Sequence, residues 1–90
     1  MQGKNAPQTH TGTLDGTVIS EINAAEKDLT GQSAPVKGGP TAQAQKHAGE
    51  PINASNLHDI TEGEKQVAGE RVKGGPTATA QSELAKARQS

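Results

Sequence analysis

Apolar residues recur at helical spacing in two stretches of the chain, residues 17–31 and residues 56–69. In the first stretch they stand three or four positions apart, which predicts an amphipathic helix. In the second stretch the same spacing gives a thinner apolar stripe, because a glutamate stands within it. The two stripes consist of Val18, Ile22, Ala25 and Leu29, with Ile19 and Glu26 beside them, and of Leu57, Ile60, Glu64 and Val67.

Residues that favour helix ends flank both stretches. Thr17 is suited to cap the start of the first helix, and Gly31 stands where that helix would end. In the second stretch Asn56 and Asp59 resemble a capping pair, and Gly69 is placed to close the helix. Both helices are therefore expected to be short and bounded by glycine.

A ten-residue string occurs twice, as VKGGPTAQAQ at residues 36–45 and as VKGGPTATAQ at residues 72–81. Two glycines do not continue a helix cheaply, whereas proline suits the first helical position, where its missing N–H is not needed. Pro40 and Pro76 therefore predict the start of a second helix in each copy. The alanine-rich residues that follow favour helix, although an isolated helix of this length is marginal in water.

The repetition divides the chain into two similar units. Residues 1–16 are interpreted as a disordered tail, residues 17–49 as the first repeat unit, residues 50–56 as a linker, and residues 57–90 as the second repeat unit. Each unit is expected to form a helix, a loop and a second short helix. Two copies are fewer than the three or more that a solenoid needs, so the expected architecture is a small all-α one.

Composition changes this picture, because large apolar residues are scarce. Only 12 of the 90 residues are Leu, Ile or Val, and the chain has no Phe, Trp, Tyr or Cys. That proportion lies below the usual range of globular proteins, and burial of so few side chains does not offset the conformational entropy of folding. The chain is therefore predicted to be largely intrinsically disordered when hydrated, with latent helical structure.

The charge pattern narrows the classes of partner. Nine basic and ten acidic residues are interspersed and give a net charge of −1. A nucleic-acid partner is not expected, since there is neither a basic patch nor an aromatic residue to stack on bases. Residues 1–13 lack the apolar core of a secretory signal, and no apolar run approaches the length of a membrane span. An intracellular location, cytoplasmic or nuclear, is the resulting expectation.

Candidate chemistry is sparse. His10, His47 and His58 stand far apart and match no metal-ligand spacing, so they are interpreted as solvated side chains and no metal or cofactor is expected. The repeated KGGPT string invites comparison with a phosphate-binding loop, but it lacks the order of a Walker motif and is better explained as a helix start. No serine stands in a nucleophile motif. The chain is not expected to be an enzyme.

The order of residues within each unit resembles the seed maturation protein domain of the late embryogenesis abundant proteins. The shared pattern is I-x-x-x-E-x-x-x-T-G, a short loop, and then G-G-x-x-A-x-A-Q-x-x-A, whose last alanine is Ala48 in the first copy. The second copy departs at Ala68, where the pattern has threonine, and at Leu84–Ala85, where the last alanine is shifted. The matching residues, with the proline that follows each glycine pair, are Ile22, Glu26, Thr30, Gly31, Gly38, Gly39, Pro40, Ala42, Ala44, Gln45, Ile60, Glu64, Gly69, Gly74, Gly75, Pro76, Ala78, Ala80 and Gln81.

This resemblance implies a protein that protects against desiccation and related stress, disordered in water and more helical when dry. Its partners would be non-specific client proteins or membrane surfaces, and the alanine-rich helices would also allow weak self-association. An alternative is a disordered interaction module, a regulator or effector, that folds on one specific protein partner. A small helical domain that is already folded in water, as a monomer or an oligomer, is the remaining hypothesis.

Overall fold

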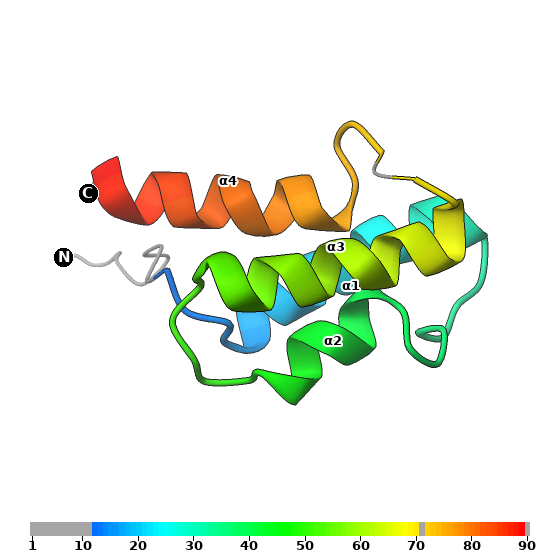
Figure 1. Cartoon of the computed structure of the whole chain (residues 1–90), viewed down its shortest axis with the longest axis horizontal. Coiled ribbons are helices and arrows are strands. Elements are labelled where there is room, and N and C mark those ends of the chain that lie inside the picture. The colour runs from blue at the N-terminus through cyan, green and yellow to red at the C-terminus, as the bar shows by residue number, and fades with distance from the viewer. Residues whose placement is uncertain (1–11, 71, 90) are drawn as a thin grey trace, which may run out of the picture.

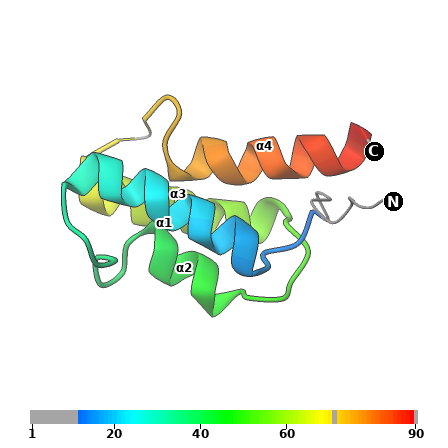
Figure 2. The ribbon, with the colours of Figure 1, turned by 180° about the vertical axis from the view of Figure 1, so that it is seen from behind.

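The computed structural model describes residues 12–70 and 72–89. Within this part of the chain the structure is all-α, as expected, with four helices: α1 (Gly16–Thr30), α2 (Pro40–Lys46), α3 (Ala54–Ala68) and α4 (Pro76–Gln89). Helices α1 and α3 lie side by side, and α2 and α4 flank this pair on opposite sides (Figures 1 and 2). Each repeat therefore supplies one long central helix and one flanking helix.

The helix ends that glycine and proline predict are confirmed. Gly31 and Gly69 adopt left-handed backbone with φ of 71° and 83°, and their N–H groups close the last turns of α1 and α3. Pro40 and Pro76 are the first residues of α2 and α4. These residues act through their own backbone preferences, which is why the sequence identifies them without knowledge of the fold.

The predicted starts of the two long helices were wrong. Asp15, not Thr17, caps α1, and its Oδ1 accepts a hydrogen bond of 3.0 Å from the N–H of Val18. Asn53 caps α3, three residues before the position predicted. It forms a reciprocal capping box with Asn56, in which each side chain accepts from the backbone N–H of the other at 2.9 Å. Both caps stand outside the predicted stretches, residues 17–31 and 56–69.

An isolated antiparallel bridge joins Thr13 to Pro51. Next to it, the N–H of Leu14 donates to the carbonyl of Glu50 at 2.9 Å, and the N–H of Ile52 donates to the carbonyl of Gly12 at 2.7 Å. A shift of 38 positions along the sequence relates Thr13 to Pro51, Leu14 to Ile52 and Gly12 to Glu50, so it converts one of these two hydrogen bonds into the other. The same shift relates α1 to α3 and the cap Asp15 to the cap Asn53. An approximate two-fold axis therefore passes through the bridge.

This symmetry moves the boundaries of the repeat. The predicted disordered tail includes residues 12–16 and the predicted linker is residues 50–56, but the bridge, both caps and two core side chains lie in these two segments. We therefore describe the molecule as an N-terminal half, residues 12–49, and a C-terminal half, residues 50–89. The rest of the predicted tail, residues 1–11, lies outside the described residues.

The core is small and draws on both halves. Its buried members stand in equivalent pairs, one from each half: Leu14 with Ile52, Ile22 with Ile60, and Ala44 with Ala80; Val18 adds to them. Three more apolar residues, Ile19, Leu57 and Leu84, pack against this cluster while partly exposed. Because the aliphatic stripes of α1 and α3 meet here, neither half could bury its stripe alone.

The long helix of each half packs most extensively on the flanking helix of the other half, α3 on α2 and α1 on α4. At the α2–α3 crossing a Cβ on Gly63 would lie 2.6 Å from the carbonyl carbon of Gly39, so only glycine permits this approach. The equivalent residue of α1 is Ala25. Between α1 and α4 lies an open hollow of about 600 Å³, which is lined by Ala24, Ala78 and Ser82 among others.

Candidate functional site

The family-motif glutamate of the first repeat is buried under the repeated string. Glu26 of α1 is only 1% exposed. Its Oε2 accepts a hydrogen bond of 2.6 Å from the N–H of Val36, and its Oε1 accepts one of 3.0 Å from the N–H of Thr41 in the first turn of α2. The carboxylate thus holds both ends of the VKGGPT string, a contact that we call a glutamate clamp.

The second repeat forms the same glutamate clamp. Glu64 of α3 is fully buried and accepts from the N–H of Val72 and, at 2.9 Å, from the N–H of Thr77 at the start of α4. Val72 and Thr77 are the residues that match Val36 and Thr41 in the repeated string. The two clamps are therefore one structural device used twice.

The glycine pair of each string makes room for the clamp. Gly38 and Gly74 both have φ of 77°, a conformation that side chains disfavour. The next glycines lie against the carboxylates, since a Cβ would stand 3.1 Å from Oε2 of Glu26 at Gly39 and 2.7 Å from Oε2 of Glu64 at Gly75. One glycine therefore sets the turn and the other leaves space for the anion.

The string does hold an anion at a helix start, but the anion is a side chain of the same protein. Within the described residues no basic side chain forms an ion pair with Glu26 or Glu64. Their charge is compensated by backbone N–H groups at the start of α2 and α4, where the helix dipole favours negative charge. The interpretation of KGGPT as a helix start is confirmed, and the clamp adds the reason for its glycines.

Two threonine hydroxyls beside the clamps are unsatisfied. Thr41 and Thr77 are each 1% exposed, and their Oγ1 atoms have no hydrogen-bond partner in the described part of the chain. A buried hydroxyl without a partner costs about 1–3 kcal/mol. Because both repeats carry it, the folded state contains two equivalent polar groups that water would satisfy better.

The other motif residues have structural positions. Ile22, Ile60, Ala44 and Ala80 belong to the core, and Gly31 and Gly69 end the long helices. The hydroxyl of Thr30 donates to the carbonyl of Glu26 at 3.0 Å and accepts from the N–H of Gln32. The remaining motif side chains are partly buried in the case of Ala42 and Ala78 and exposed in the case of Gln45 and Gln81.

One histidine is not the solvated side chain that the sequence suggested. Nδ1 of His47 lies 2.9 Å from Oε1 of Glu50, and its Nε2 lies 2.7 Å from Oδ2 of Asp59 on α3. The hydrogen bonds to Asp59 and then to Glu50 raise the pKa of His47 above its ordinary 6.5. The hydrogen bond from His47 also lowers the pKa of Asp59 below 3.8. His47 therefore ties the end of α2 to α3.

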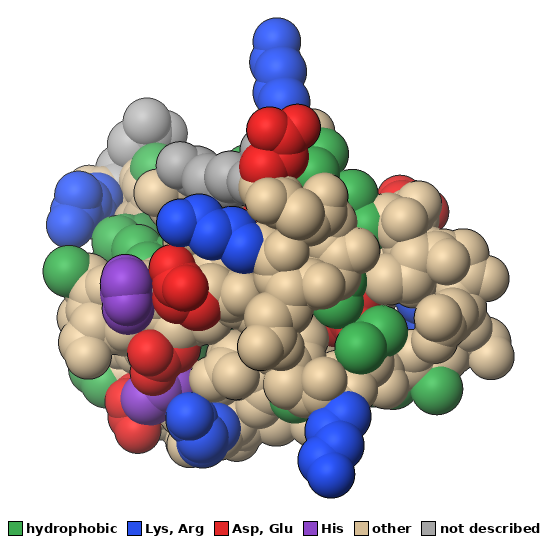
Figure 3. Space-filling model, turned by 45° about the vertical axis from the view of Figure 1, so that its right-hand side comes forward, with side chains coloured by type: hydrophobic (Ala, Val, Ile, Leu, Met, Phe, Trp, Pro, Cys, Tyr) green, Lys and Arg blue, Asp and Glu red, His purple; other side chains and the backbone are tan. Residues whose placement is uncertain are grey.

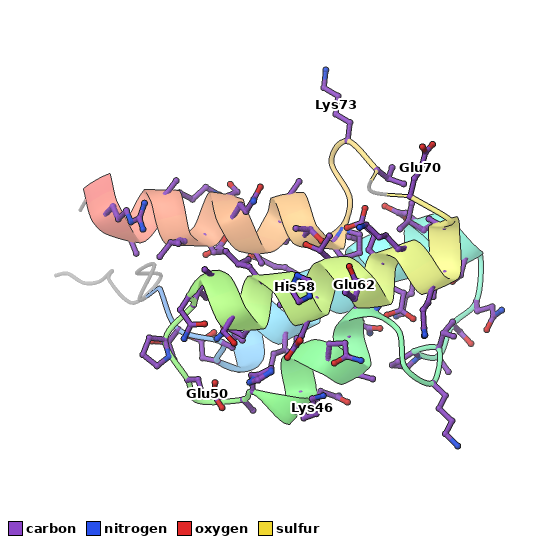
Figure 4. All side chains as sticks on the ribbon, viewed as in Figure 1. Lys46, Glu50, His58, Glu62, Glu70 and Lys73 are labelled. Carbon is purple, nitrogen blue, oxygen red and sulfur yellow. The ribbon has the colours of Figure 1, made fainter. Side chains whose placement is uncertain are left out.

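The other two histidines do not join this group. His58 is exposed on α3, beside Glu62 (Figure 4), and His10 lies outside the described residues. No group of three or more His, Asp or Glu residues that could hold a metal ion occurs in the described ranges, residues 12–70 and 72–89. The sequence could not find the His47 contacts, because Asp59 is 12 positions away and meets it only in the fold.

The surface carries charges of both signs among small polar and apolar side chains. Figure 3 shows acidic and basic side chains interspersed on one face. Glu70 and Lys73 extend away from the helices on the loop between α3 and α4 (Figure 4). None of the helices in the described part of the chain is long and apolar enough to cross a membrane.

Comparison of the chain with models of known protein families, with curated proteins and with solved structures gives no match. The likeness to the seed maturation protein domain therefore depends on the repeated motif itself. In this chain that motif corresponds to a physical device: a buried glutamate, the amides that it binds and the glycines that make room for it.

Proposed function

We propose that this chain is a non-enzymatic protectant against water loss and related stress. It stays largely open in abundant water, gains helix as water is withdrawn, and then shields client proteins or membrane surfaces without strong specificity. We place it inside the cell, in the cytoplasm or the nucleus. The proposal joins the residue pattern shared with seed maturation protein domains to the physical properties of the folded chain.

The observation that carries the proposal is the pair of glutamate clamps. To fold, Glu26 and Glu64 must each give up their hydration and accept backbone N–H groups instead. Removal of a carboxylate from water is costly, and hydrated backbone amides lose partners as well. Both costs fall when little water is present to compete. Water loss therefore shifts the balance toward the clamped, helical state.

The small size of the core also supports a helix content that depends on hydration. Within the described residues, seven buried apolar residues form the core, and two of these are alanine. The clamps and the unsatisfied hydroxyls of Thr41 and Thr77 add polar costs that water relieves in the open chain. A chain with these opposing terms is expected to change its helix content with hydration, which is what a desiccation protectant requires.

The test is far-UV circular dichroism of the intact chain in buffer and again after drying, with a drying-sensitive enzyme protected in parallel. We expect helix content to rise on drying, and the enzyme to keep more activity when dried with this chain than with serum albumin. A chain that keeps the same helix content in both states, or gives no protection, would contradict the proposal.

The clamp variant with Glu26→Gln and Glu64→Gln supplies the matched control, because it has the same length and similar polarity. It should need more severe drying to reach the same helix content. If the intact chain protects nothing and instead captures one partner in stoichiometric amount, the alternative of an interaction module that folds on binding is favoured.

A further inference from the structure

The contact between the two halves is built from equivalent segments on both sides. Thr13 and Pro51 face each other across the approximate two-fold axis. This axis also converts the hydrogen bond from Leu14 to Glu50 into the one from Ile52 to Gly12. The packing of α1 on α4 likewise matches that of α3 on α2. Each half therefore presents to the other the kind of surface that pairs identical subunits in two-fold dimers.

The connection between the halves is very short. Helix α2 ends at Lys46, and the bridged segment of the C-terminal half begins at Glu50. The intervening turn is held by the N–H of Glu50 on the carbonyl of His47 at 3.0 Å and by the N–H of Gly49 on the carbonyl of Leu14 at 2.8 Å. Gly49 has φ of 87°, which side chains disfavour. Residues 47–49 thus form a tight hinge, in which His47 is half-buried and Ala48 and Gly49 are exposed.

One side chain fastens this hinge in its closed form. His47 contacts Glu50 and Asp59, which both belong to the C-terminal half. The other two hinge residues, Ala48 and Gly49, are exposed and add no large side chain to these contacts. Opening of the hinge would separate the two halves and break the turn hydrogen bond from Glu50 to His47, while leaving the surface of each half intact.

We propose that the surface that each half presents to the other also binds a second copy of this chain. In the resulting dimer the N-terminal half of each chain pairs with the C-terminal half of the other. The same surfaces are paired in the monomer and in the dimer, so their contacts contribute equally to the free energies of the two forms. The balance then depends on the hinge and on concentration, since a short tether acts as an effective concentration in the millimolar range.

Exchange is tested with two single variants of the intact chain, Thr13→Cys and Pro51→Cys. The chain has no cysteine of its own. These positions form an antiparallel pair flanked by hydrogen bonds, with Cα atoms about 4.5 Å apart in such pairs, which a disulfide can bridge. One variant is labelled with ¹⁵N, and the two are mixed, concentrated in an osmolyte that favours the folded state, and oxidised.

We expect mass spectrometry to show the mixed disulfide dimer in excess of its statistical share, and this excess to grow with protein concentration. Cross-links in the statistical proportion of random collision would overturn the proposal. So would an excess of either like dimer, because it would mean that each half pairs with its own kind.

A second variant forces the hinge open. Both cysteine substitutions are placed on one chain, with or without deletion of Ala48 and Gly49. At low concentration the chain with the intact hinge should form its disulfide within one molecule, whereas the shortened chain should form a covalent dimer. A shortened chain that still cross-links within itself would overturn the proposal. If the shortened chain does not fold, the mixture of single variants still decides.

Discussion

The two helix crossings between the halves are related by symmetry but packed differently. At the α2–α3 crossing, Gly63 allows α3 to approach the Gly39–Pro40 peptide, and the side chains of Gln66 and Val67 lie against Gly38 and Gly39. At the α1–α4 crossing the residue equivalent to Gly63 is Ala25, and a Cβ on Gly74 would have nothing within 4 Å. There the hollow of about 600 Å³ remains open.

A single methyl group can decide how closely a repeated pair of helices packs. Glycine within a helix costs about 1 kcal/mol relative to alanine. Gly63 bears that cost and is buried at a backbone contact, whereas Ala25 keeps helix propensity and its crossing stays looser. Both repeats thus contain a glutamate clamp, but the long helix of one repeat keeps its helix propensity at Ala25, whereas the long helix of the other packs closely at Gly63.

The largest expected effect comes from removing a clamp. Glu26→Gln keeps the shape of the side chain, but its single amide oxygen can accept from only one of the two N–H groups. The other buried N–H group then faces the amide NH₂ group, which is also a donor. We expect a loss of about 3 kcal/mol of folding free energy. The effect should be larger for Glu26→Gln than for Glu64→Gln, because the first clamp lies beneath the tight crossing.

This prediction is checked by far-UV circular dichroism along titrations with an osmolyte that favours the folded state. Glu62→Gln is the matched control, since Glu62 lies on the same helix as Glu64 with its side chain 53% exposed. Equal shifts for Glu26→Gln and Glu62→Gln would contradict the role of the clamp.

The next effect concerns the tight crossing itself. Gly63→Ala should destabilise the fold by about 1–2 kcal/mol, because the overlap with the Gly39 carbonyl outweighs the gain in helix propensity. Ala25→Gly should cost no more than about 1 kcal/mol, which is the loss of helix propensity. A closer approach of α1 to α4 would recover part of that loss. The same titrations measure both.

Gly16→Ala is the control for this pair. Gly16 begins α1 and has open space around its position, so alanine there should be neutral or slightly stabilising. If Gly63→Ala behaved like Gly16→Ala, the close crossing would not exist in solution.

The smallest effect that we expect is a pH dependence of stability from the His47 contact between the two halves. The raised pKa of His47 means that its contribution to stability is complete below pH 6.5 and is lost as the pH rises through the folded value. The lowered pKa of Asp59 means that its contribution is present above pH 3.8 and is lost as the pH falls through its folded value. Stability from this contact should therefore be greatest between these two values.

Osmolyte titrations at several pH values, with and without salt, measure this dependence. Asp59→Asn should flatten the decline on the alkaline side, and salt should weaken the contact because it lies near the surface. An alkaline decline that is unchanged in Asp59→Asn would show that another group causes it.

The sequence alone determined the elements whose physics is local. Gly31 and Gly69 end helices because glycine adopts left-handed backbone at little cost, and Pro40 and Pro76 begin them because proline needs no N–H there. Helical spacing of apolar residues also located both long helices, although their caps were missed. Asp15 and Asn53 compete with nearby Thr17 and Asn56 as caps, and the pattern alone does not choose among them.

Only the tertiary structure decided what the repeated glutamates do. The pattern placed Glu26 and Glu64 on or beside the apolar stripes, but their partners stand 8 to 15 positions later in the chain and meet them only when the loop folds back. The same holds for Leu14, Ile52 and His47, whose burial or pairing depends on the other half of the molecule. Local propensity is written in neighbouring residues, whereas burial of a charge and the approach of two backbones depend on segments that the chain brings together from far apart.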